Sequence, residues 1–167
     1  TPSFPGLAPG PNNQLLATGT TNPTSGDTLW QIDPSSGDVA LHQGLVLPFP
    51  LSSTAAAFDG QDAVLAPASF GSLSLGSVSV TSGVGSEIII PNPTSEEWGV
   101  INGLAFDPLS DTLFALAEVE TVDFVQESRL VSIDLNTATA TEVGGLDFGS
   151  PFPFPLGLAF NTDNGLL

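Results

Sequence analysis

The sequence predicts an all-β protein built from repeats, with three complete copies and the start of a fourth. One motif recurs at regular intervals, as GLAPGP at 6–11, AAAFDG at 55–60, GLAFDP at 103–108 and GLAFNT at 157–162. A second motif follows it in the same order, as LWQIDP at 29–34, SVSVTS at 77–82 and LVSIDL at 130–135. No stretch of ten residues carries the apolar stripe of a helix. Two motifs that recur in one order indicate a true structural repeat.

Within each copy the pattern is that of short strands. In the third copy, apolar and β-branched runs alternate with clusters of turn residues, and the runs cover 103–106, 112–119, 129–134 and 139–143. Runs of this length between Asn, Asp, Gly and Ser clusters predict antiparallel hairpins. Four strands in about 40–50 residues are the size of one β-propeller blade. The fold class we predict is therefore all-β, with propeller-like blades of four antiparallel strands.

The chain is expected to form one repeat domain over residues 1–167. Its blades are predicted at about 6–47, about 52–93 and about 103–148, with a partial fourth repeat at 157–167. The third strand of each blade carries two apolar side chains, which we expect in the core between blades. These pairs are Trp30 and Ile32, Val78 and Val80, and Val131 and Ile133.

The fourth repeat is interrupted at Leu166 and Leu167, where its second strand should be forming. Three explanations remain open: the chain is a piece of a longer polypeptide, it associates with copies of itself through open strand edges, or the repeats form an open sheet. Self-association gives a ring if the rotation closes and a filament if it does not.

Segments of the first and third copies carry a family resemblance. The stretches GLAFDPLSDTLFAL (103–116), RLVSIDLNTATATEVGGL (129–146) and TLWQIDPSSGDVALHQGL (28–45) resemble the degenerate β-propeller repeats of bacterial secreted and cell-surface proteins. The resemblance covers nearly the whole chain and is weakest between residues 60 and 93. It implies an architecture and leaves the function open, because such repeats occur in binding modules, scaffolds and some enzymes.

The charge balance excludes several classes of function. Eighteen acidic residues face a single basic one, Arg129, for a net charge of −17. Nucleic-acid binding and docking to anionic lipid both need clusters of Lys and Arg, which the chain lacks. It has no cysteine, so a disulfide framework is impossible, and its apolar runs are too short for a membrane-spanning helix. The composition favours a secreted or cell-surface protein.

Three groups of residues are candidate sites. Four carboxylates lie in the long loop of the third copy and could bind calcium: Glu118, Glu120, Asp123 and Glu127. In the alternative interpretation this loop is solvated, or Arg129 pairs with one of its acids. Trp98, after two glutamates in a connector, could stack on a sugar. Phe154 and Pro155, with Leu166 and Leu167 at the interrupted repeat, could contact a partner.

These observations predict a non-enzymatic extracellular repeat protein that acts as a scaffold or self-assembling subunit. No catalytic constellation stands out, and no cofactor is expected beyond a candidate calcium ion. The alternative is a propeller module that binds a glycan or a peptide, assisted by calcium. A weaker alternative is part of a larger hydrolase whose active residues lie outside these 167 positions.

Overall fold

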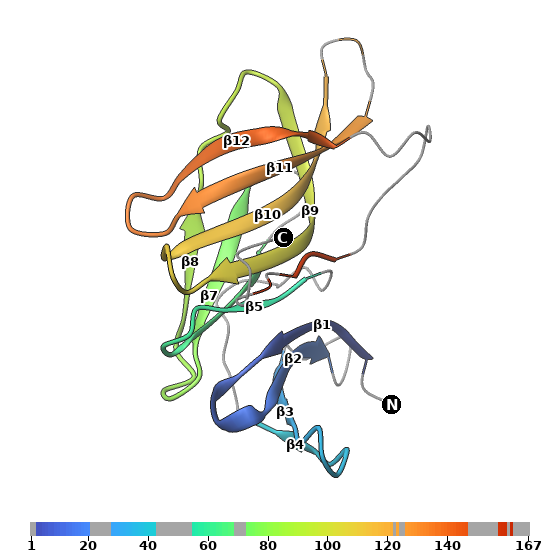
Figure 1. Cartoon of the computed structure of the whole chain (residues 1–167), viewed down its shortest axis with the longest axis vertical. Coiled ribbons are helices and arrows are strands. Elements are labelled where there is room, and N and C mark those ends of the chain that lie inside the picture. The colour runs from blue at the N-terminus through green and yellow to red at the C-terminus, as the bar shows by residue number, and fades with distance from the viewer. Residues whose placement is uncertain are drawn as a thin grey trace.

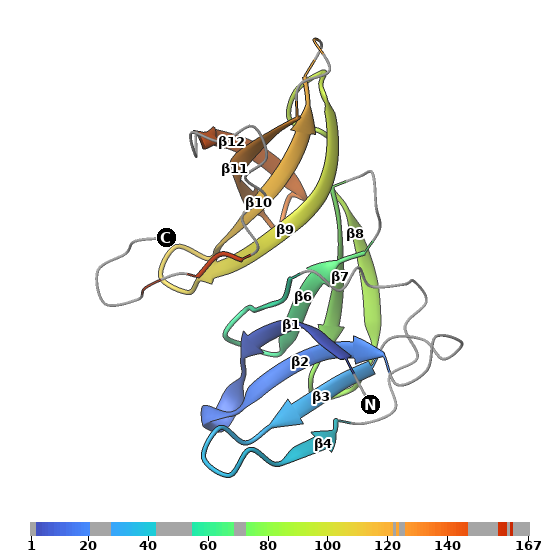
Figure 2. The same ribbon diagram turned by 90° about the vertical axis from the view of Figure 1, so that its right-hand side faces the viewer.

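The computed structural model describes residues 3–20, 28–42, 55–68, 73–121, 123, 126–146, 157–159 and 161. These residues form strands β1 to β12 and one short 3-10 turn, η1, with no α-helix among them. The strands belong to three sheets of four strands each (Figures 1 and 2). Within this part of the chain, no helix has the length and apolar character needed to cross a bilayer.

Each sheet is one continuous segment of the sequence. Sheet 1 contains β1 (Ser3–Pro9), η1 (Pro11–Asn13), β2 (Leu15–Thr20), β3 (Thr28–Ile32) and β4 (Val39–Leu41). Sheet 2 contains β5 (Ala57–Phe58), β6 (Ala63–Pro67), β7 (Ser74–Ser79) and β8 (Gly85–Ile89). Sheet 3 contains β9 (Glu97–Asp107), β10 (Thr112–Glu120), β11 (Gln126–Asp134) and β12 (Thr139–Leu146).

Every sheet is an antiparallel meander in which strands pair in chain order. This confirms the predicted fold class of blades with four antiparallel strands. The third blade begins earlier than predicted, because β9 starts at Glu97 and not near residue 103.

The sheets pack face against face, and sheet 2 lies between the other two (Figure 2). We call the face of a sheet that points to the preceding sheet its leading face, and the opposite one its trailing face. Alternation along β6 shows the division: Val64 packs toward sheet 1 and Leu65 toward sheet 3. Sheet 2 is thus covered on both faces, as the inner blades of a propeller are.

Two apolar cores hold the three sheets together. Between sheets 1 and 2, Ala8, Leu16 and Leu29 meet Val64 and Val78. At the outer edge of the same interface, a ring nitrogen of His42 lies 2.8 Å from the carbonyl oxygen of Val80. The larger core joins the trailing face of sheet 2 to the leading face of sheet 3, and its fully buried members include Leu65, Leu75, Trp98, Leu113 and Ile133.

The inner strands lie side by side, with β5 in contact with both β1 and β9. Two glycines at equivalent repeat positions allow close approach here. A Cβ atom on Gly6 would lie 3.0 Å from the carbonyl oxygen of Ala55, and one on Gly103 would lie 2.9 Å from the backbone of Gly157. Residues 157–159, at the start of the fourth repeat, therefore lie on the trailing side of β9. Ala55, at the start of the second repeat, lies in the same way on the trailing side of β1.

Candidate functional site

One face of sheet 1 consists mainly of apolar side chains, with Thr28 as a polar member of β3. Two rows of residues in register cross the four strands: Leu7, Ala17, Trp30 and Leu41 in the first, and Pro9, Leu15, Ile32 and Val39 in the second. Residues in register, and residues two apart on a strand, point to the same side of a sheet. The intervening side chains pack against sheet 2. These eight residues therefore form most of the leading face of sheet 1, to which Gly19 and Thr28 also belong.

The same positions of sheet 3 are buried against sheet 2. There the rows are Leu104, Ala115, Val131 and Glu142, and Phe106, Leu113, Ile133 and Ala140. All of them except Glu142 belong to the large core. In sheet 1 much of this face is open to solvent, with Leu7 53%, Leu41 51% and Val39 46% exposed, whereas Ala17 is fully buried. The leading face of sheet 1 thus has the apolar residue pattern of an interface between blades, but much of it is exposed to solvent.

Trp30 lies near the middle of this face and is half-buried. Its indole nitrogen donates to the hydroxyl of Thr28 at 2.9 Å, so its polar atom is satisfied within its own strand. The sequence placed Trp30 and Ile32 in the core between blades. This predicted burial is not met, since both lie on the leading face of sheet 1 and remain partly exposed.

The four predicted calcium ligands do not converge. Glu118 and Glu120 lie on the trailing side of β10, and the pleat puts Glu127, which pairs with Val119, on the other side of the sheet. Asp123 is exposed beyond the strand. Within the described ranges, no three acidic, His or Cys side chains gather closely enough to hold a metal ion.

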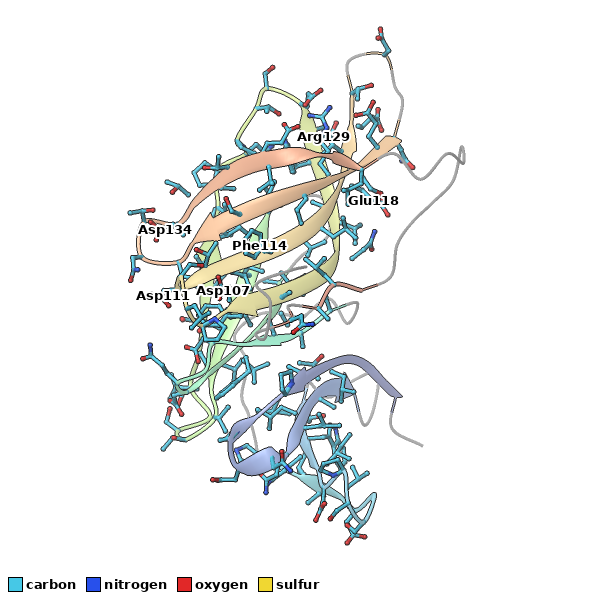
Figure 3. All side chains as sticks on the ribbon, viewed as in Figure 1. Asp107, Asp111, Phe114, Glu118, Arg129 and Asp134 are labelled. Carbon is cyan, nitrogen blue, oxygen red and sulfur yellow. The ribbon has the colours of Figure 1, made fainter. Side chains whose placement is uncertain are left out.

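Two of these glutamates have other partners. Glu118 accepts a hydrogen bond from the side-chain amide of Asn102 at 2.7 Å. Glu127 accepts from Arg129 at 3.1 Å, as the alternative interpretation of the loop proposed. Figure 3 shows Glu118 and Arg129 at the same end of sheet 3, far from the hairpins at its other end.

Arg129 is a structural clamp on the leading side of sheet 3. Its guanidinium donates to both carboxylate oxygens of Glu96, with Nη2 3.0 Å from Oε1, and also to Glu127 and Glu142. The Arg129 side chain is only 12% exposed. The hydrogen bonds from Arg129 hold the pKa of Glu96 below its ordinary value. The clamp ties the connector before β9 to β11 and β12.

Trp98 belongs to the same connection and is fully buried. Its indole nitrogen donates to Thr94 Oγ1 at 2.9 Å, and that hydroxyl donates to Glu96 at 3.1 Å. The prediction that Trp98 is an accessible platform for a ligand is wrong, because β9 begins one residue before it and turns its ring into the core. The other predicted contact residues, Phe154, Pro155, Leu166 and Leu167, lie outside the described residues.

Several acidic side chains hold turns, as their sequence context indicates. Asp33, Asp107 and Asp134 each accept backbone N–H groups from residues two or three positions on. Asp62 bridges further: it accepts from the hydroxyl of Ser79 and from the backbone and hydroxyl of Thr81. The hydrogen bond from Ser79, followed by those from Thr81, lowers the pKa of Asp62.

A polar cavity of about 410 Å³ lies on the trailing side of sheet 3, at the hairpin end of its strands. Five of its lining residues carry hydroxyl groups, among them Ser132 and Thr141, and the other three are Asp111, Asp134 and Asn136. Figure 3 shows Asp111 and Asp134 at this end of the sheet. Hydrogen bonds from the backbone of Asn136, followed by Thr137, hold the pKa of Asp134 below its ordinary value. The two end faces of the array therefore differ: the leading face of sheet 1 is mainly apolar, and the trailing face of sheet 3 is polar at its hairpin end.

Comparisons with known proteins find likenesses among solved structures. No protein-family model and no curated protein matches the chain. Among solved structures, the chain is similar to an oligogalacturonate lyase in complex with manganese, with 14% sequence identity and a TM-score of 0.46. The match covers 79% of this chain and 36% of the lyase, so the chain spans about a third of that protein's length.

The sequence predicted a chain that is not an enzyme, and this prediction is corrected by the comparison, because the matching structure is that of an enzyme. A TM-score of 0.46 is below the level that shows a common fold. Neither the reaction of the lyase nor its manganese is therefore carried over to this chain.

Proposed function

We propose that this chain is a repeat scaffold of the cell exterior that associates with a second copy of itself through the leading face of sheet 1. The observation that carries this proposal is the equivalence of that face to the leading face of sheet 3. Position by position, the residues that sheet 3 buries against sheet 2 have apolar counterparts in sheet 1, and of these Leu7, Val39 and Leu41 remain exposed. Contiguous apolar patches of this kind are uncommon on soluble monomers and mark interaction surfaces.

A second copy fits this face better than a charged partner does. All eight side chains are uncharged, so the face offers no ion pair to an oppositely charged surface. Its burial is driven by the release of water from apolar surface, as in the two cores already present within the chain. The apolar faces of the sheets in this protein already pack in this way.

The net charge of −17 sets the salt dependence of such association. Two copies repel each other at long range, and salt screens that repulsion: the Debye length falls from about 10 Å at 0.1 M to about 3 Å at 1 M. Self-association should therefore strengthen as salt is added. Capture of a basic partner would weaken instead.

The test is the mass in solution at rising protein concentration, measured by light scattering or sedimentation. We expect species of at least twice the 17.0 kDa of one chain, favoured by salt. Leu41→Glu on the leading face should shift the protein to single chains. The matched control is Ile89→Glu, because Ile89 is an apolar strand residue of sheet 2 that is 71% exposed and lies off this face. A single 17.0 kDa species at every concentration, or equal effects of the two substitutions, would refute the proposal.

A second function, recognition of a glycan, is favoured by the polar cavity of sheet 3. Its hydroxyls both donate and accept hydrogen bonds, and its carboxylates accept from the paired hydroxyl groups of a sugar. No basic side chain lines it, which disfavours anionic ligands. Glycan binding that disappears in Thr141→Val but persists in Ser86→Ala, a change on sheet 2, would support this function. Equal binding by both variants would argue against it.

A further inference from the structure

We infer that Asn102 is a site of spontaneous deamidation that the fold suppresses, and that its deamidation makes the opening of sheet 3 irreversible. Asn102 is followed by Gly103 in the middle of β9. An asparagine before glycine deamidates readily, because glycine has no Cβ to keep its backbone nitrogen from the asparagine side chain. This inference goes beyond the proposed self-association, since it concerns the interior of one sheet.

The reaction consumes water and releases ammonia. The backbone nitrogen of Gly103 loses its proton to base and attacks the side-chain carbonyl carbon of Asn102. The bond from that carbon to the side-chain nitrogen breaks, and ammonia leaves. Water then opens the cyclic imide at either of its carbonyl groups. The product is an aspartate, or an isoaspartate in which the main chain runs through the side-chain carbon.

The fold keeps the two reacting groups apart. Asn102 is only 5% exposed, and its side-chain nitrogen donates to Glu118 Oε1 at 2.7 Å. Gly103 is paired with Leu116 of β10. Ring closure requires the Asn102 side chain to leave Glu118 and meet the backbone nitrogen of a residue that is held in the sheet. The reaction is therefore expected when β9 leaves sheet 3.

Both residues of this labile pair have a structural role. A Cβ atom on Gly103 would lie 2.9 Å from the backbone of Gly157, so a larger residue does not fit there without a shift of the chain. Asn102 supplies the side-chain donor from which Glu118 accepts. The packing of the inner strand thus explains why a chemically labile dipeptide lies in the interior of sheet 3.

Deamidation turns the contact with Glu118 into a repulsive one. An aspartate at position 102 places a second carboxylate where an amide now donates, and two ionised carboxylates only accept hydrogen bonds. The chain has no Lys, and its single Arg, Arg129, is bonded to three glutamates on the other side of the sheet. No Lys or Arg is therefore available to neutralise the pair. An isoaspartate lengthens the main chain and shifts β9 against β10.

Substitutions that reproduce the aspartate product test this contact. Asn102→Asp should lower the Tm by roughly 6–12 °C, because it leaves a buried acceptor facing Glu118. The matched control is Asn136→Asp, which adds the same charge at an exposed turn and should change the Tm little. Adding Glu118→Gln to Asn102→Asp restores a donor and should recover most of the loss. Equal Tm values for the two aspartate variants, or a double variant no more stable than Asn102→Asp, would overturn the inference.

Peptide mapping of the unmodified protein, incubated in mildly alkaline buffer with and without urea, follows the reaction itself. Asn102 should deamidate at least about 10³-fold more slowly without urea, because only a very small fraction of a folded protein is open at any time. Asn164, which also precedes a glycine, is counted separately in the same map, and Asn164→Gln removes its contribution. After removal of urea, the refolded fraction should fall in proportion to the loss of intact Asn102. Equal rates with and without urea, or complete refolding of chains deamidated at Asn102, would overturn the inference.

Discussion

Two neighbouring leucines on β2 distinguish the interior of the protein from its proposed contact surface. Leu16 points to sheet 2 and is 1% exposed, and Leu15 points to the leading face of sheet 1 and is half-buried. Changing each to alanine removes the same atoms from adjacent positions of one strand. The pair is therefore a matched test of how the faces are assigned.

The expected losses of unfolding free energy follow from burial. Leu16→Ala removes three buried carbon atoms, worth about 2.4 kcal/mol of transfer free energy, and leaves a cavity that adds to the loss, for a total of about 3 kcal/mol. In a chain of this length such a loss lowers the Tm by roughly 6–12 °C. Leu15→Ala removes partly solvated atoms and should cost about 1 kcal/mol in dilute solution.

Urea unfolding followed by tryptophan fluorescence measures both losses. The loss for Leu16→Ala should be the same at low and high protein concentration, because its partners lie within the chain. The loss for Leu15→Ala should grow with concentration, because the unmodified protein is then stabilised by association and the variant less so. Equal losses in dilute solution would refute the assignment of faces. A loss for Leu15→Ala that does not change with concentration would refute its place in the contact.

Three further predictions concern the polar contacts. The pKa of Asp62 is lowered in the folded state. The stabilisation that the ionised carboxylate provides is therefore present above its unfolded pKa near 4 and is lost as the pH falls through the lower folded pKa. The difference in urea midpoint between the unmodified protein and Asp62→Asn should accordingly shrink from pH 6 to pH 2. Arg129→Gln should lower the Tm most at neutral pH, where Glu96 is ionised, and least at pH 2–3. Thermal melts at the two pH values measure this difference. An equal drop in Tm at both would contradict a stabilising ion pair between Arg129 and Glu96. A chelator such as EDTA should leave the Tm unchanged, because Glu118 accepts from Asn102 and Glu127 lies on the other side of the sheet, and a lowered Tm would contradict this arrangement.

Repeats and strand periodicity predicted the architecture because they depend on local sequence alone. The motif copies at 55–60 and 103–108 place the inner strands β5 and β9, and the second motif places β3, β7 and β11. The same alignment matched Trp30 to Val131, and both lie on the leading face of their sheet. It could not show that one leading face is covered and the other open, because burial depends on which sheets come together.

The misplaced site residues have an equally physical cause. Two glutamates before Trp98 suggested a solvated connector, but Glu96 is paired with Arg129, which is distant in sequence, and the strand begins at Glu97. The acidic loop looked like a ligand set because its residues are close in sequence. The pleat of β10 and β11 separates Glu118 from Glu127, and this separation appears only when the register of the hairpin is known.

The position of Arg129 also allows trypsin cleavage to measure the unfolding of sheet 3. Trypsin cleaves after Lys or Arg, and the chain holds a single residue of this kind, in the middle of β11 with a strand paired on each side. A protease needs several residues of extended, unpaired backbone, so cleavage there requires β11 to leave sheet 3. The rate at which trypsin produces two fragments should therefore measure the opening of the third blade. The protein needs no label for this assay, and it offers trypsin no second cleavage site.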